Sequence, residues 1–357
     1  MSHRTPYRDL IAAAASLVDA ALLDDSSATV PVLRFRGDAS LVDLEYLPNE
    51  AAREYLSKNR NALSAARIAL QNECAVPVRY DQQFYTEHTE DFGHLRSLAK
   101  TFALELSHAK LNSDFAAAVR IGVDLLELAN AVRRGGLLMD FLVSLSISSM
   151  AIEELRGGPS HRSDRAESTR RELRNELARI ERSRESLQVI VDRDRKWEAA
   201  VGWQDESVDF ANIPLSEMET GIPEEHQRAV FDALQSMANL PSDELTLRYR
   251  ELDNRDLAMQ RLLFVDLALR SYQAIHQSYP DNLTSLVPTI CSDLPGDPFT
   301  DDLFRYQRLA MDKFVLYSPG PTQVDHGGQF GHWLAVTAGE ADLCLDVGDY
   351  WWDEWSI

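Results

Sequence analysis

The sequence predicts a mainly helical protein that ends in a small module of mixed α and β structure. Three observations support this fold class. Apolar residues recur at spacings near 3.6 over most of the chain, which is the period of an amphipathic helix. Glycine and proline residues separate these segments. Near the C-terminus, a long helical pattern is followed by a pair of short strands that ends in a glycine-rich turn.

Residues 1–158 are expected to form the helical region, as an irregular solenoid or bundle. Helices are predicted over residues 5–24 and 49–73, with a short strand at Val30–Phe35 between them. Residues 74–92 are rich in aromatic side chains and are expected to be irregular.

Three more helices are predicted in quick succession, over residues 94–110, 114–132 and 136–156. Asn112-Ser113 and Gly135 separate them, because asparagine, serine and glycine favour turns. The first pair resembles a helical hairpin of the tetratricopeptide type, but the chain has no clean repeat of about 34 residues. Irregular helical hairpins are therefore the prediction for this region.

Residues 159–240 are predicted to form a charged helical segment, which follows a linker at Gly157–Ser160. Ser168–Val191 is expected to be one long helix whose apolar residues fall on a heptad seam: Leu173, Leu177, Ile180, Leu187 and Val191. Packing of this seam on the chain's own bundle is the first interpretation, and a homo-oligomeric coiled-coil contact through residues 168–191 is the second. A further helix is predicted over residues 223–239.

Residues 241–357 are predicted to form the α+β module, beginning with a helix from Ser242 to about Ser278. Pro280 ends this helix, because proline lacks an N–H group and disfavours helical geometry in the residue before it. A short turn of helix, Leu283–Pro288, and two antiparallel strands, starting at Arg305 and at Phe314, are expected to follow.

The tail, Glu340–Ile357, alternates acidic and aromatic residues. It is predicted to form a last strand and a strap over the sheet. An exposed aromatic patch that binds a partner is the alternative, because exposed aromatic clusters mark interfaces.

An ordered set of residues between Arg261 and Gly328 forms a family pattern: Tyr272, Tyr279, Pro280, Leu294, Pro295, Asp297, Pro298, Phe299, Arg305, Tyr306, Gly320, Asp325, Gly327 and Gly328. This set resembles the C-terminal part of the major pseudopilin of type II secretion systems. It is also similar to the pseudopilin-like module at the end of many planctomycete proteins. The resemblance covers about a fifth of the chain.

The resemblance implies an association with a secretion or pilus-like envelope system. Pseudopilins are anchored by an N-terminal hydrophobic helix, whereas here the corresponding helix follows some 240 residues of other sequence. No signal peptide is visible. The longest apolar run, Leu137–Ile152, carries Asp140 and is shorter than the roughly 20 residues that span a bilayer. No transmembrane segment is therefore predicted, and the expected compartment is either the cytoplasm or the cell envelope.

The resemblance also implies a calcium site, because the major pseudopilin binds calcium in the loop after the corresponding strand. Ser318 matches the family's serine ligand, Leu316 would supply a backbone carbonyl, and Asp325 is a candidate carboxylate. The family's aspartate after the glycine is Thr322 here, so Asp342 would have to compensate together with Asp325. No other cofactor is predicted.

The composition and motifs of the chain exclude several classes of function. A net charge of −21 argues against nucleic-acid binding, which needs clustered lysine and arginine. The sequence has no P-loop, GxGxxG, GxSxG or HExxH motif. Its three cysteines, Cys74, Cys291 and Cys344, show no CxxC spacing and are expected to be partly buried thiols.

Two polar clusters are weak candidates for chemistry. Glu87, His88, Asp91 and His94 lie within eight residues, but a metal would need another, distant ligand. The first interpretation of this cluster is that its side chains are solvated on the surface, and the second is that they bind a metal. The same two interpretations apply to His326 and His332 beside Asp325.

The leading function hypothesis is a non-catalytic scaffold or interaction protein with protein partners. A soluble helical-repeat adaptor that binds peptides or proteins in a concave groove is the second hypothesis. The third is an enzyme with a cryptic site around Glu87, His88 and His94.

Overall fold

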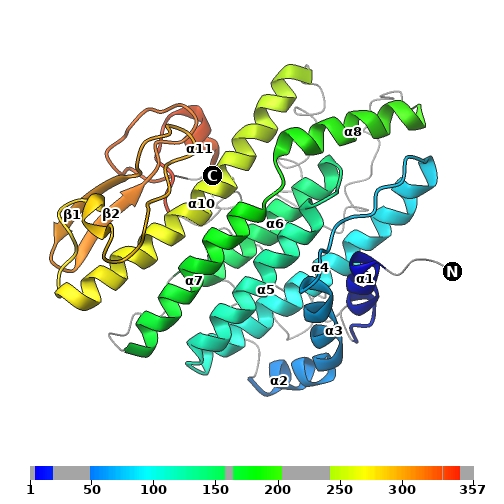
Figure 1. The fold of residues 1–357 in the computed structure, drawn as a ribbon, viewed down its shortest axis with the longest axis horizontal. Coiled ribbons are helices and arrows are strands. Elements are labelled where there is room, and N and C mark those ends of the chain that lie inside the picture. The colour runs from blue at the N-terminus through cyan, green and yellow to red at the C-terminus, as the bar shows by residue number, and fades with distance from the viewer. Residues whose placement is uncertain (1–4, 19–48, 157–163, 203–241, 332, 346–357) are drawn as a thin grey trace, which may run out of the picture.

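The structure is a computed structural model that describes residues 5–18, 49–156, 164–202, 242–331 and 333–345. It is mainly helical, with a small two-stranded antiparallel sheet near the C-terminus, which confirms the predicted fold class (Figure 1). Several predicted elements lie outside the described residues: the strand Val30–Phe35, the helix over residues 223–239 and the tail beyond Leu345.

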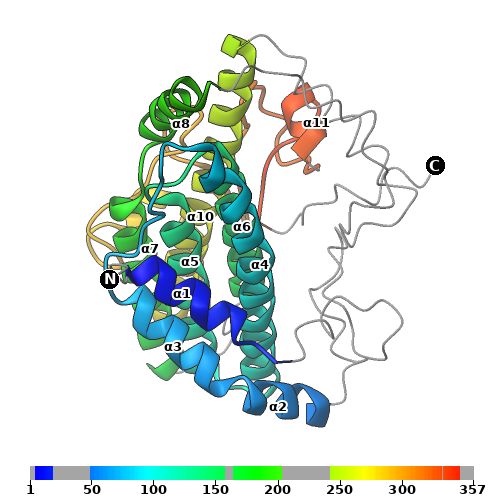
Figure 2. The same ribbon diagram turned by 90° about the vertical axis from the view of Figure 1, so that its right-hand side faces the viewer.

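Six helices are described before residue 157: α1 Pro6–Ala15, α2 Asn49–Lys58, α3 Arg60–Leu70, α4 Gln82–Leu111, α5 Phe115–Arg133 and α6 Leu138–Leu155. Helices α4, α5 and α6 pack on one another, with α5 antiparallel to the other two, and α1 lies across α4 beside α3 (Figure 2). The predicted helices over residues 114–132 and 136–156 are confirmed as α5 and α6.

Helix α4 starts well before the predicted position near residue 94, so the prediction of irregular structure is wrong for residues 82–92. The carboxylate of Asp81 accepts a hydrogen bond from the backbone N–H of Phe84 at 2.7 Å. This is the geometry of a helix N-cap, which satisfies a backbone donor that has no partner within the helix. Of the aromatic residues in this stretch, Phe84 is buried in the first turn of α4, whereas Tyr80 precedes the helix and is half exposed.

The single helix predicted over residues 49–73 is divided at Asn59, which is buried. The side-chain amide of Asn59 bonds both the N–H (2.8 Å) and the carbonyl (3.1 Å) of Val18. The break therefore coincides with a long-range contact to the segment after α1, and local sequence alone does not specify it.

The charged segment forms two helices, α7 Asp164–Ser183 and α8 Leu187–Val201, so the prediction of one helix over residues 168–191 is wrong. The break is at Arg184, whose side chain reaches two carboxylates of another helix. All five residues of the heptad seam are buried within the chain, which confirms the first interpretation. A homo-oligomeric coiled coil through this seam would require the helices to leave their own bundle.

The C-terminal part contains α10 Ser242–His276, the short 3-10 helix η4 Leu283–Leu286, the strands β1 Arg305–Ala310 and β2 Lys313–Tyr317, and α11 Trp333–Ala338. The two strands pair antiparallel, with Arg305 opposite Tyr317. The predicted long helix, turn of helix and strand pair are therefore confirmed.

Helix α10 lies between the bundle helices α6 and α7 on one side and the hairpin and η4 on the other (Figure 1). Its middle section carries a run of buried apolar residues: Ala258, Leu262, Leu263, Val265, Leu267, Ala268 and Leu269. One continuous apolar cluster runs from Tyr7 in α1 to Leu345.

Among the helices that the structure describes, none is both long and apolar enough to cross a membrane.

Candidate functional site

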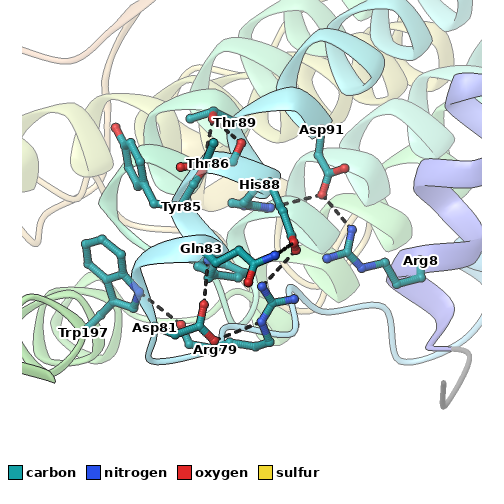
Figure 3. A network of polar contacts seen from close by, with 12 residues as sticks. Arg8, Arg79, Asp81, Gln83, Tyr85, Thr86, His88, Thr89, Asp91 and Trp197 are labelled. Carbon is teal, nitrogen blue, oxygen red and sulfur yellow. Dashed lines mark hydrogen bonds and ion pairs between the residues drawn. The ribbon is translucent and has the colours of Figure 1, made fainter. Parts of the chain in front are cut away.

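Four charged or titratable side chains meet inside the helical region, and we call them the His88 cluster: Arg8, His88, Asp91 and Asp140. His88 Nε2 lies 2.6 Å from Asp140 Oδ1, and His88 Nδ1 lies 3.3 Å from Asp91 Oδ2. Arg8 Nη1 donates to the same Asp91 oxygen at 3.2 Å (Figure 3). The cluster thus joins α1, α4 and α6.

Each helix places its residue by local rules. His88 and Asp91 are three residues apart on α4, so they lie on the same face. Asp140 is in the first turn of α6, and its Oδ2 accepts the N–H of Leu137 at 2.8 Å. Asp140 is completely buried, so its charge depends on this N–H group and on His88.

Aromatic rings surround the imidazole of His88, which is only 4% exposed. The ring of Phe84 stacks on it at 4.9 Å between centroids, and the ring of Phe92 meets it edge-on at 5.0 Å. Tyr7 of α1 lies on a third side at 6.0 Å. A cationic imidazole is stabilised by aromatic faces as well as by the two carboxylates.

The surroundings of His88 favour its protonated form. Burial lowers the pKa of this side chain, but the hydrogen bonds and charges of Asp140 and Asp91 outweigh burial and raise the pKa to about 9. At neutral pH the cluster therefore contains two cations, His88 and Arg8, and two carboxylates. Its charges balance, which explains how the group can be buried.

The structure separates the residues that the sequence grouped with His88. Glu87 lies on the outer face of α4, where its carboxylate accepts hydrogen bonds from Arg79 at 2.9 Å and from Gln83 at 2.6 Å (Figure 3). His94 is exposed. The prediction that these polar side chains lie on the surface is therefore correct for Glu87 and His94 and wrong for His88 and Asp91, which are buried. In the described part of the chain, no three His, Cys, Asp or Glu side chains gather as a metal-binding group.

The geometry of the His88 cluster suits a tie between helices. Both imidazole nitrogens contact carboxylates, so neither has a free lone pair for a metal or for a substrate proton. Sequence reasoning missed Arg8 and the pairing with Asp140. A lone aspartate within the apolar run Leu137–Ile152 was the available signal, because a buried carboxylate requires a partner.

A second buried group of charges joins α5, α10 and the break between α7 and α8. We call it the Arg184 cluster: Arg133, Arg184, Asp253 and Asp256. Arg184 donates to Asp253 Oδ1 and to Asp256 Oδ2, each at 2.5 Å. Arg133 Nη2 lies 2.9 Å from Asp253 Oδ1. These contacts fix the position of α10 on the bundle.

The candidate calcium ligands lie around the end of β2. Leu316 and Ser318 are buried there. The Ser318 hydroxyl accepts the N–H of Gly320 at 3.0 Å and bonds to the carboxylate of Asp297, a side chain whose pKa is raised by burial. Asp325 faces other groups: its carboxylate accepts hydrogen bonds from the Tyr317 hydroxyl at 2.9 Å and from the Gly327 N–H at 2.8 Å.

Asp342 organises the glycine-rich turn that follows. It is completely buried, and its carboxylate accepts the N–H groups of His326 at 3.1 Å and Gly328 at 2.8 Å. These backbone donors stabilise its negative charge without a metal ion. Asp342 therefore acts as an anchor of the turn in this structure. The predicted pairing of His326 with His332 cannot be described, because His332 lies outside the described residues.

Calcium binding at Leu316, Ser318 and Asp325 stays a prediction. If these residues bind calcium, millimolar calcium should raise the melting temperature of the wild-type chain, because a ligand of the native state stabilises that state. Asp325→Asn should abolish the rise, and magnesium serves as the control ion. A wild-type melting temperature that calcium leaves unchanged would show that the resemblance does not extend to the ion site.

Three large apolar side chains are more than half exposed at the far end of the C-terminal module, and we call them the tip patch. They are Ile275 (57% exposed), Leu309 (57%) and Met311 (68%). The N–H of Tyr279 donates to the carbonyl of Met311 at 3.1 Å, and Arg308 donates to the carbonyl of Tyr279 at 3.1 Å. These bonds hold the hairpin turn against the end of α10 (Figure 1).

Comparisons of this chain with protein-family models, curated proteins and solved structures found no match. The similarity to pseudopilins therefore depends on the residues of the sequence alone.

Proposed function

We propose that this protein is a non-catalytic scaffold that binds a protein partner through the tip patch, in association with a secretion or pilus-like envelope system. The exposure of the tip patch is the observation that supports the binding role most directly. Large apolar side chains that gather on a surface are characteristic of interaction sites. The exposed apolar residues of the helical region, such as Ile68 and Met139, are on separate helices.

The charge of the hairpin indicates the chemistry of the partner. The segment Arg305–Lys313 carries three basic side chains and one acidic one, within a chain of net charge −21. Within the chain, Arg305 pairs with Asp325 and Arg308 pairs with Asp281, so charged groups of both signs lie around the hairpin that carries Leu309 and Met311. A partner surface with apolar residues at its centre and charged groups of both signs at its rim fits this arrangement, because complementary charge guides association and selects partners.

The helical region fits the role of a rigid platform for the tip patch. The His88 and Arg184 clusters use buried charge to join helices that are distant in sequence, and the continuous apolar core links α10 to the bundle. A partner bound at the hairpin would therefore be held at a fixed position relative to the bundle.

A matched pair of variants tests the proposal. Leu309→Ser combined with Met311→Ser should reduce recovery of the partner at least tenfold after mild crosslinking in the native host, which corresponds to about 1.4 kcal/mol. Ile68→Ser should leave recovery unchanged, because Ile68 is equally apolar and 60% exposed but lies on α3. Both variants should fold, since exposed positions tolerate substitution. Equal recovery of the partner with the wild type, the double variant and the Ile68→Ser variant would refute binding at the tip patch.

The same experiment tests the cellular association when soluble and membrane fractions are analysed separately. Secretion or pilus components that depend on Leu309 and Met311 would support the envelope association. If the dependent partner is instead a soluble protein unrelated to secretion, the binding role stands and the envelope association is wrong.

A further inference from the structure

A small polar cavity of about 20 Å³ lies between α5, α6, α7 and α10, beside the Arg184 cluster. Its polar lining comes from seven side chains: Asn130, Arg133, Ser144, Ser148, Arg184, Asp256 and Gln260. All of them except the partly exposed Arg184 are at most 5% exposed, so the cavity lies mainly within the interior of the protein.

Several polar atoms of this lining have no hydrogen-bond partner in the protein. Arg133 Nη1 is a donor without an acceptor, and Arg133 Nη2 has only its ion-pair contact with Asp253. Asp256 Oδ1 and Gln260 Oε1 are acceptors without donors. Their neighbouring atoms are satisfied: Gln260 Nε2 donates to Asp256 Oδ2 at 3.0 Å and to Ser148 Oγ at 3.2 Å. A buried polar atom left without a partner is destabilising, so three of them around one cavity require an explanation.

The hydrogen-bonding character of these atoms, one donor and two acceptors, identifies the kind of molecule that fits. An anion would satisfy Arg133 but would be repelled by the two oxygens, and a cation would meet the opposite difficulty. Arg133 and Arg184 contact Asp253 and Asp256, so charges of both signs lie beside the cavity. A small neutral molecule that both donates and accepts hydrogen bonds meets all three atoms.

We propose that this cavity is a permanent hydration site, in which bound water bridges Arg133 on α5 to Asp256 and Gln260 on α10. The cavity has room for a water-sized molecule, and a buried water typically makes about three hydrogen bonds, the number available here. The water completes the Arg184 cluster and is part of the contact between α10 and the bundle.

A second cavity provides an internal control. It also measures about 20 Å³, and its open surface is almost wholly apolar, with Leu106, Phe115, Val119, Leu155, Leu173 and Leu267 among its lining residues. Apolar cavities of this kind remain dry and accept xenon, whereas hydrated polar cavities do not. The two cavities should therefore respond in opposite ways to the same probe.

The test is a high-resolution crystal structure of the full chain, collected with and without xenon pressure and after a bromide soak. We expect water density within hydrogen-bond distance of Arg133 Nη1 and Asp256 Oδ1, xenon in the apolar cavity, and neither xenon nor bromide in the polar one. An empty polar cavity, or one that takes xenon, would overturn the proposal. Bromide bound at Arg133 would show that the site is an anion site instead.

Discussion

Replacing His88 by leucine should lower the free energy of unfolding by about 3–5 kcal/mol. The substitution leaves Asp140 completely buried without the cation that lies 2.6 Å from its carboxylate, and the loss of one partner from a buried ion pair has an effect of this size. Denaturant unfolding of the full chain measures the loss. His94→Leu, on the exposed face of the same helix, should change stability by no more than about 0.5 kcal/mol. Similar losses for the two variants would show that the His88 cluster does not hold the helices together.

The stabilisation by His88 should also depend on pH in a defined direction. The pKa of His88 is about 9 in the folded chain, against 6.5 for an ordinary histidine, so the folded state binds more protons between these values. The stabilisation is complete below pH 6.5 and is lost as the pH rises through about 9. The difference in unfolding free energy between the wild type and His88→Gln should therefore shrink over this range. A constant difference would mean that His88 acts without its charge.

Replacing Arg184 by methionine should lower the free energy of unfolding by about 3 kcal/mol. The variant removes the guanidinium that bonds both Asp253 and Asp256, and Asp256 is buried. Arg133 and Gln260 retain one contact each with these carboxylates, which limits the loss.

Arg179→Met is the matched control for Arg184→Met, because Arg179, on α7, is also an arginine with two carboxylate partners but is exposed. Exposed ion pairs contribute about 0–1 kcal/mol, so its loss should be small. If the control costs as much as Arg184→Met, the Arg184 cluster does not determine how α10 is held.

Local signals in the sequence were sufficient for much of the fold. Gly135, Pro280 and the periodic apolar residues of α5 and α10 specify these helices within a short window, and the hairpin has strand residues on both sides of its turn. The start of α4 and the division of α7 from α8 were predicted wrongly. The second of these coincides with contacts from Arg184 to Asp253 and Asp256, about 70 residues further along the chain.

The residues of the candidate site also differ in whether local sequence or long-range packing brings them together. Sequence spacing brought His88 and Asp91 together correctly, because one helix carries both. It also grouped Glu87 and His94 with them, although these side chains lie on other faces of α4. Arg8 and Asp140 come from other helices, so only the packing of α1 and α6 on α4 reveals them. Likewise, the partner of Ser318 is Asp297, which precedes the hairpin.

The most direct test of partner binding at the tip patch is site-specific photo-crosslinking in the native host. A photoreactive side chain at position 311 replaces the most exposed residue of the tip patch, and the same group at position 68 serves as the control. Binding as proposed predicts one discrete crosslinked species from position 311 and none from position 68. A discrete species from position 68 and none from position 311 would place the interaction surface on the helical region and contradict the proposed function.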